Sequence, residues 1–102
     1  MYLSGQVRER IKQEIVASLS EFPEIRRIVV FGSFVNSDTP RDLDIAIFQD
    51  SAEGYYPLAM KYRQKLRTVA NKIPLDVIPL RRSPQNDPFI QEIQGGEVLY
   101  ER

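Results

Sequence analysis

IRRIVVFGS at residues 25–33 and DLDIAIF at residues 42–48 are the two stretches that decide the fold of this chain. Both are rich in β-branched and aromatic residues, which is typical of strands. The first ends in a nearly continuous apolar run, so we expect it to lie in the centre of a sheet. In the second, side chains alternate between faces, and Leu43, Ile45 and Ile47 share one of them. The other face carries Asp42, Asp44, Ala46 and Phe48.

Helical periodicity precedes and follows these strands. A first helix should begin after Ser4 and end before Pro23, with Val7, Ile11, Ile15 and Leu19 as its apolar stripe. A second should run from about Pro57 to Lys72, with the stripe Leu58, Tyr62, Leu66 and Val69. A third strand is expected at 75–78, a last helix at 88–94 and an extended segment at 98–100. Helices and strands interleave, so we expect an α/β (α+β) fold: one domain over residues 1–102, with a small mixed sheet of three to four strands.

The composition excludes several kinds of chemistry. Among 102 residues there is no Cys and no His, which rules out disulfides, thiolate nucleophiles, Ser-His-Asp triads and imidazole metal ligands. Metal ligands must therefore be mainly oxygens, which favours Mg²⁺, Mn²⁺ or Ca²⁺. The formal charge is zero, so tight nucleic-acid binding is not expected. No apolar run approaches the ~20 residues that span a bilayer, so we expect a cytoplasmic protein.

The expected strands carry a group of residues suited to phosphate chemistry. Gly32-Ser33 directly follows the first strand, Asp42 and Asp44 lie on the second, and Asp76 lies on the third. Asp42 and Asp44 should lie on one strand face, roughly 6.5–7 Å apart, and repel each other by about 2 kcal/mol at an effective dielectric of 20. A divalent cation would turn that repulsion into attraction, and Asp76 on the third strand could join it. Gly32 would let a phosphate approach the backbone, while Ser33 could donate its hydroxyl and amide to the same oxygens.

Simpler interpretations of the same residues exist. Asp42 and Asp44 could belong to a solvated strand face, and Asp76 could be an ordinary surface residue. Ser33 could merely cap a helix. Tyr55, Tyr56 and Tyr62 could stack on a base, although packing is the commoner role of such residues, and the basic residues from Lys61 to Arg67 should form a solvated helix face.

Taken together, VVFGS at 29–33, the Asp-x-Asp pair of DLDIAI at 42–47, LDV at 75–77 and GGEVLY at 95–100 resemble the DNA polymerase beta-like nucleotidyltransferase superfamily. The small prokaryotic branch, the minimal nucleotidyltransferases, is the most similar. The resemblance implies that Gly32 and Ser33 hold the nucleotide phosphates, that Asp42 and Asp44 bind the metals, and that Asp76 completes the catalytic and metal site. One departure is Phe34, which stands where members often carry Arg.

The resemblance also implies a cofactor, a substrate and a partner. The expected activity is Mg²⁺- or Mn²⁺-dependent transfer of AMP from ATP to a hydroxyl of a HEPN-type toxin. This chain would then be the antitoxin in a hetero-oligomer. One alternative is an idle antitoxin that neutralises the toxin by binding alone. Another, an aminoglycoside-type nucleotidyltransferase, would need a second domain to form its drug pocket, and 102 residues leave no room for one.

Overall fold

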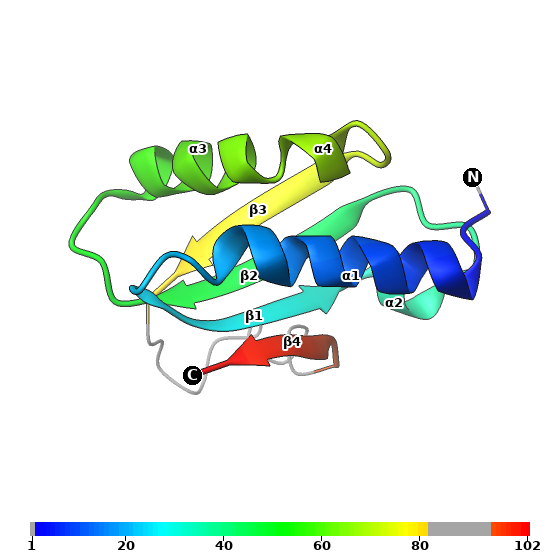
Figure 1. Cartoon of the computed structure of the whole chain (residues 1–102), viewed down its shortest axis with the longest axis horizontal. Helices are drawn as coiled ribbons and strands as arrows, with labels where there is room; N and C mark the ends of the chain where they lie inside the picture. The colour runs from blue at the N-terminus through cyan, green and yellow to red at the C-terminus, as the bar shows by residue number, and fades with distance from the viewer. Residues whose placement is uncertain (1, 82–94) are drawn as a thin grey trace.

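The computed structural model describes residues 2–81 and 95–102, and its centre is a four-stranded sheet with the order β3-β2-β1-β4 (Figure 1). β1 pairs antiparallel with both β2 and β4, whereas β2 and β3 run parallel. The mixed sheet and the interior position of β1 that the sequence predicts are confirmed. The elements are α1 (Gly5–Leu19), β1 (Ile25–Phe31), α2 (Ser33–Asn36), β2 (Leu43–Gln49), α3 (Tyr55–Lys65), α4 (Arg67–Ala70), β3 (Leu75–Leu80) and β4 (Glu97–Glu101).

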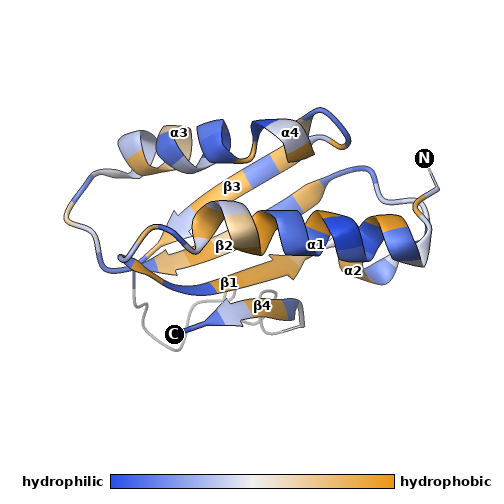
Figure 2. Ribbon diagram, in the orientation of Figure 1, coloured by the Kyte–Doolittle hydropathy of each residue, from blue (hydrophilic) through white to orange (hydrophobic). Residues whose placement is uncertain are grey.

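The main core lies between one face of the sheet and the helices α1, α3 and α4, with Phe34 of α2 also packed into it. Leu43, Ile45 and Ile47 of β2 are buried on this face as expected, and β1 is buried continuously from Ile28 to Phe31. Figure 2 shows the hydrophobic stretches of both strands beside the mixed colouring of α1. The fully buried side chains of this core include Ile11, Ile15, Leu19, Ile28, Val30, Leu43, Ile45, Ile47, Leu58, Tyr62, Leu66 and Val69. Burying each large apolar side chain stabilises the fold by roughly 1.5–3 kcal/mol, so this face anchors the helices.

The opposite face of the sheet has a different character. Val29, Phe31 and Ala46 form a second, smaller apolar cluster there, against which Phe48, Ile78 and Leu80 pack. Strand register places Asp44 and Asp76 on this same face, at the end of the sheet where β1 terminates. One face of the sheet therefore packs against the helices, and the other carries the acidic side chains.

Four expectations about the helices and strands need correction or completion. Val7 is 38% exposed, because a spacing of four residues turns a helix by about 40° per step and carries the end of the stripe away from the sheet. The second helix begins at Tyr55 and is interrupted at Leu66, whose φ of −97° and ψ of 17° are not helical. β3 continues to Leu80, and the helix expected at 88–94 lies outside the described residues. None of the described helices is long and apolar enough to cross a membrane.

A polar cluster attaches α3 to the start of β1. The Tyr62 hydroxyl and the Lys61 ammonium each donate to the Glu24 carboxylate at 2.9 Å, so Lys61 is an exception to the solvated basic face expected here. Burial alone would raise the pKa of Glu24, but the hydrogen bonds from Lys61, its own backbone and Tyr62 outweigh burial and hold that pKa below its ordinary value. Burial, followed by the Glu24 carboxylate, raises the pKa of Tyr62 well above its usual range.

This cluster predicts a stability difference that depends on pH. A lowered folded-state pKa contributes stability above the ordinary value of 4.5, and that contribution is lost as the pH falls through the lower folded value. Glu24→Gln should therefore lower the free energy of unfolding by about 1–3 kcal/mol at pH 7 and by much less at pH 3. Urea unfolding at both pH values measures this, with Glu101→Gln as the exposed control. A deficit of equal size at both pH values would contradict the assignment.

Candidate functional site

Strand register brings two of the three predicted acids side by side. Phe31 is paired with Asp44 across β1 and β2, and Asp44 is paired with Asp76 across β2 and β3. Paired residues of neighbouring strands lie about 4.8–5.5 Å apart and share a face. Asp42 is exposed and lies just before β2, two residues from Asp44. All three acids therefore stand at one end of the sheet, next to the turn that follows β1.

Gly32 makes the closest approach in this region. Its φ of +77° and ψ of −151° belong to a conformation that is essentially restricted to glycine. A Cβ atom at this position would lie only 2.5 Å from Asp44 Oδ2. The Asp44 carboxylate thus lies directly against the Gly32 backbone, and no larger residue could take this place without moving one of the two.

Ser33 links the turn to the acidic strand in a way the sequence did not reveal. Its hydroxyl donates to the carbonyl of Asp42 and accepts from the amide of Arg41, both at 3.3 Å. The N-cap of α2 is Gly32, and no side chain caps that helix, so the cap role considered for Ser33 is absent. The Ser33 side chain instead ties the turn to the segment that carries the Asp-x-Asp pair.

The donor atoms suit a hard divalent cation. The candidate ligands are carboxylate oxygens, which Mg²⁺ and Mn²⁺ prefer. Over residues 2–81 and 95–102, no three acidic side chains are yet close enough together to hold one ion. Asp42 and Asp76 are both exposed, so each can change rotamer at little cost and turn toward Asp44.

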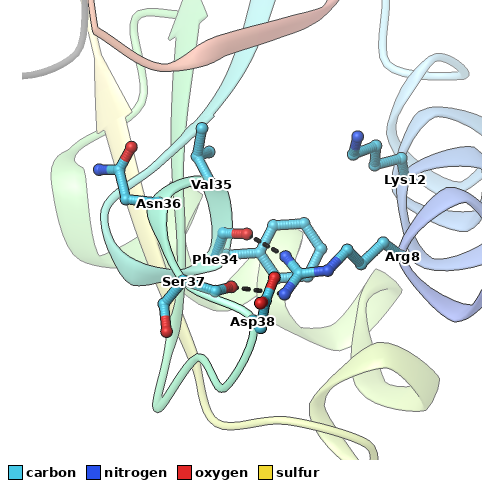
Figure 3. A pocket seen from close by; sticks show the side chains of 7 residues that line it. All are labelled: Arg8, Lys12, Phe34, Val35, Asn36, Ser37 and Asp38. Atoms are coloured by element: carbon cyan, nitrogen blue, oxygen red, sulfur yellow. Dashed lines mark hydrogen bonds between the residues drawn. The ribbon is translucent and has the colours of Figure 1, made fainter. Parts of the chain in front are cut away.

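Arg8 is the supporting residue that sequence reasoning missed. From α1 it donates through Nε to the carbonyl of Leu3 at 3.3 Å, and its guanidinium reaches the carbonyls of Phe34 and Ser37 (Figure 3). The guanidinium carbon also lies 5.4 Å from the centroid of the Phe34 ring. Arg8, Phe34 and Ser37 are among the residues that line a cavity of about 250 Å³ between α1 and α2. Arg8 therefore fixes the far end of the turn that begins at Gly32.

Phe34 itself contributes nothing polar to the site. Its side chain is 1% exposed and belongs to the main core on the helix-covered face. The buried ring anchors the turn to the hydrophobic core. The Phe34 side chain therefore supplies packing and no phosphate contact.

Comparison with known protein families gives a match over most of the chain. The family model described as polymerase beta, nucleotidyltransferase, matches residues 13–102, which is most of the chain and includes Gly32, Ser33, Asp42, Asp44 and Asp76. The chain belongs to this family. No curated protein sequence matches it.

Solved structures agree with this nucleotidyltransferase fold. A chain of a mutant MntA–HpeT toxin–antitoxin gives a TM-score of 0.68 at 22% identity, with 89% of this chain and 73% of that chain covered. A toxin–antitoxin with AMP-PNP gives 0.68 at 24% identity, with the same coverage of both chains. The tri-AMPylated HEPN toxin of Shewanella oneidensis in complex with its MNT antitoxin gives 0.63 at 22% identity, covering 93% of this chain and 73% of that chain. At these identities the likeness establishes the shared fold.

The Gly32 geometry predicts a specific sensitivity to one methyl group. Gly32→Ala should destabilise the fold by about 1–3 kcal/mol and displace the Asp44 carboxylate, because its backbone conformation is unfavourable for alanine. Gly5→Ala is the matched control, since a Cβ there meets nothing within 4 Å. Urea unfolding of both variants checks the expectation. Equal stability of the two variants would contradict the proposed constraint.

The Arg8 contacts predict a second loss of stability. Arg8→Met keeps the apolar stem but leaves the Phe34 and Ser37 carbonyls without this donor, so we expect a loss of about 1.5–3 kcal/mol. Arg10→Met, on the exposed side of α1, should change the free energy of unfolding by less than about 0.5 kcal/mol. Thermal or urea unfolding distinguishes them. If Arg8→Met were as stable as Arg10→Met, the guanidinium would not hold the turn.

Proposed function

We propose that this chain is a metal-dependent nucleotidyltransferase that moves AMP from ATP to a hydroxyl group of a HEPN-type partner protein. The observation that carries the proposal is the register Phe31–Asp44–Asp76, which places two carboxylates beside each other and next to Gly32. Membership of the polymerase beta nucleotidyltransferase family supports it. In this proposal Asp42, Asp44 and Asp76 hold Mg²⁺ or Mn²⁺, while Gly32 and Ser33 receive the triphosphate.

The residues of the proposed site contribute to binding in different ways. Gly32 exposes its backbone to the phosphates, and the Ser33 hydroxyl can exchange its present backbone partners for a phosphate oxygen. A cation bound by the aspartates would neutralise charge on the triphosphate and on the leaving pyrophosphate. Arg8 holds the far end of the turn in place, which limits the motion that would misalign the reacting groups.

The proposed transfer is an in-line displacement at the α-phosphorus of ATP. The oxygen of the acceptor hydroxyl forms a bond with the α-phosphorus of ATP, and the bond from that phosphorus to the bridging oxygen of the β-phosphate breaks. Pyrophosphate departs with the electron pair of that bond. Asp76, the exposed carboxylate on the outer strand, takes the hydroxyl proton and passes it to water.

The partner is proposed from the neighbouring structures. Three of the structures with this fold are toxin–antitoxin complexes, and one contains a HEPN toxin modified with three AMP groups. By extension we propose that this chain serves as an antitoxin in a hetero-oligomer with such a partner. Its cytoplasmic location remains a prediction from the sequence.

Two variants should separate nucleotide binding from transfer. Asp76→Asn should keep most of the affinity for Mg²⁺–ATP yet slow transfer at least a hundredfold, because the amide cannot take the proton. Asp44→Asn should weaken Mg²⁺–ATP binding itself. Calorimetry measures the affinity, and the intact mass of the proposed HEPN-type partner measures AMP addition. Transfer by Asp76→Asn at the wild-type rate would refute the assigned role.

The binding-only alternative makes the opposite prediction in cells. If transfer neutralises the toxin, Asp44→Asn should still bind its partner but fail to protect cells that express it. Full protection by Asp44→Asn, together with a partner that gains no AMP mass from the wild-type protein, would favour neutralisation by occlusion.

A further inference from the structure

A groove of about 390 Å³ lies between α3 and β3, the outer strand of the described sheet. Tyr55, Tyr56, Met60 and Arg63 line it from the helix, and Asp76 and Ile78 are among its residues on the strand. Its exposed apolar side chains are unusually concentrated: of six large hydrophobic residues exposed in the described part of the chain, three line this groove. Tyr55, Tyr56 and Met60 are 52%, 79% and 58% exposed. The groove leads directly to the outermost acid of the proposed site.

The strand side of the groove presents backbone polar groups. The Leu43 amide donates to the Pro74 carbonyl at 2.8 Å, so that carbonyl faces β2 and the groups of Leu75 and Val77 point outward from the sheet. Arg63 already donates to the outward carbonyl of Leu75 at 3.2 Å. Among the described residues, no strand pairs with the outward edge at Val77, so an extended chain could pair there, and the pairing must stop at Pro79, which has no amide hydrogen.

The charge of the helix side favours a neutral or acidic occupant. α3 contains three basic residues and no acidic one. Lys61 pairs with Glu24 and Glu53, and Lys65 pairs with Glu21. Of the described carboxylates, none forms an ion pair with Arg63, which donates to the Leu75 carbonyl and lines the groove together with Asp76. A peptide that carries an acidic residue near its acceptor hydroxyl would find its counter-charge here.

The direction of the reaction also favours this side. Nucleophile and leaving group lie on opposite sides of the phosphorus in an in-line displacement. The proposed triphosphate site, at Gly32 and Ser33, follows β1, whereas the groove lies beyond β3 on the other side of Asp44. With the pyrophosphate toward β1, the acceptor must arrive from the side of β3.

We propose that this groove binds the acceptor segment of the protein substrate as an extended strand along the edge of β3, with its hydroxyl at Asp76; this rests on the function proposed above. Tyr55 and Arg63 are eight residues apart on α3, which is about 12 Å along the helix axis. An extended chain covers that distance in three to four residues. Side chains of an extended segment alternate between faces, and α3 and Asp76 lie on opposite faces of the sheet. The segment should therefore carry an apolar side chain, held by Tyr55, Tyr56 and Met60, three positions from the modified hydroxyl.

Tyr56→Ala tests the groove, with Tyr2→Ala as a matched control because Tyr2 is 70% exposed and absent from the groove lining. The substrate is the HEPN-type partner of the proposed function, with Mg²⁺–ATP as donor. Tyr56→Ala should raise the KM for that protein at least tenfold, while kcat and the Mg²⁺–ATP affinity stay within twofold. Tyr2→Ala should change none of these quantities.

Two other results for Tyr56→Ala would overturn the assignment of the groove to the acceptor. Weaker Mg²⁺–ATP binding by Tyr56→Ala would mean that the groove holds the nucleobase, and an unchanged KM would mean that the acceptor lies elsewhere; either overturns the inference. If the wild-type protein transfers no AMP, the proposed function fails by itself. The groove is then judged by calorimetry with the same HEPN-type protein, where equal affinity of wild type and Tyr56→Ala overturns it.

Discussion

The pairing of Asp44 with a neighbour on each side is the constraint on which the site depends. β2 is antiparallel to β1 and parallel to β3, and both registers meet at this one residue. A slip of one residue in either pairing would send Asp44 or its neighbour to the helix-covered face, because side chains alternate along a strand. The buried Leu43, Ile45 and Ile47 prevent such a slip, since it would expose all three. The apolar core therefore sets the position of the acids on the opposite face.

The helices contribute to the site without entering it. α1 fixes the turn after β1 through Arg8, and α3 is fixed to the start of β1 through Glu24 and Tyr62. Both attachments cross from one element to another over long stretches of sequence. As a result, the turn, the acidic strands and the groove beside α3 belong to one packed unit, which is the arrangement that a reaction requiring accurate alignment needs.

Local patterns in the sequence were sufficient to predict most of this fold. β1 begins and ends at the predicted residues, β2 is displaced by one, and the stripe from Leu58 to Val69 is buried although its helix is interrupted at Leu66. Such features depend on periodicity and turn residues that lie close together in the chain. The site was harder to predict in detail, because the decisive contacts join distant residues. Nothing near Arg8 distinguishes it from the other basic residues of its helix, and the hydrogen bonds of Ser33 become visible only when the segment before β2 is folded against the turn.

Pro79 has a consequence for the behaviour of the protein in concentrated solution. β3 is an edge strand, and an edge whose amides and carbonyls are unpaired can recruit the edge of another molecule and start an aggregate. A proline within such a strand interrupts the row of donors, and Arg63 already occupies one carbonyl of the same edge. As far as residues 2–81 and 95–102 show, only a short stretch around Val77 is left to pair. The edge can thus receive a brief segment of another chain while resisting the continuous strand-to-strand addition that leads to fibrils.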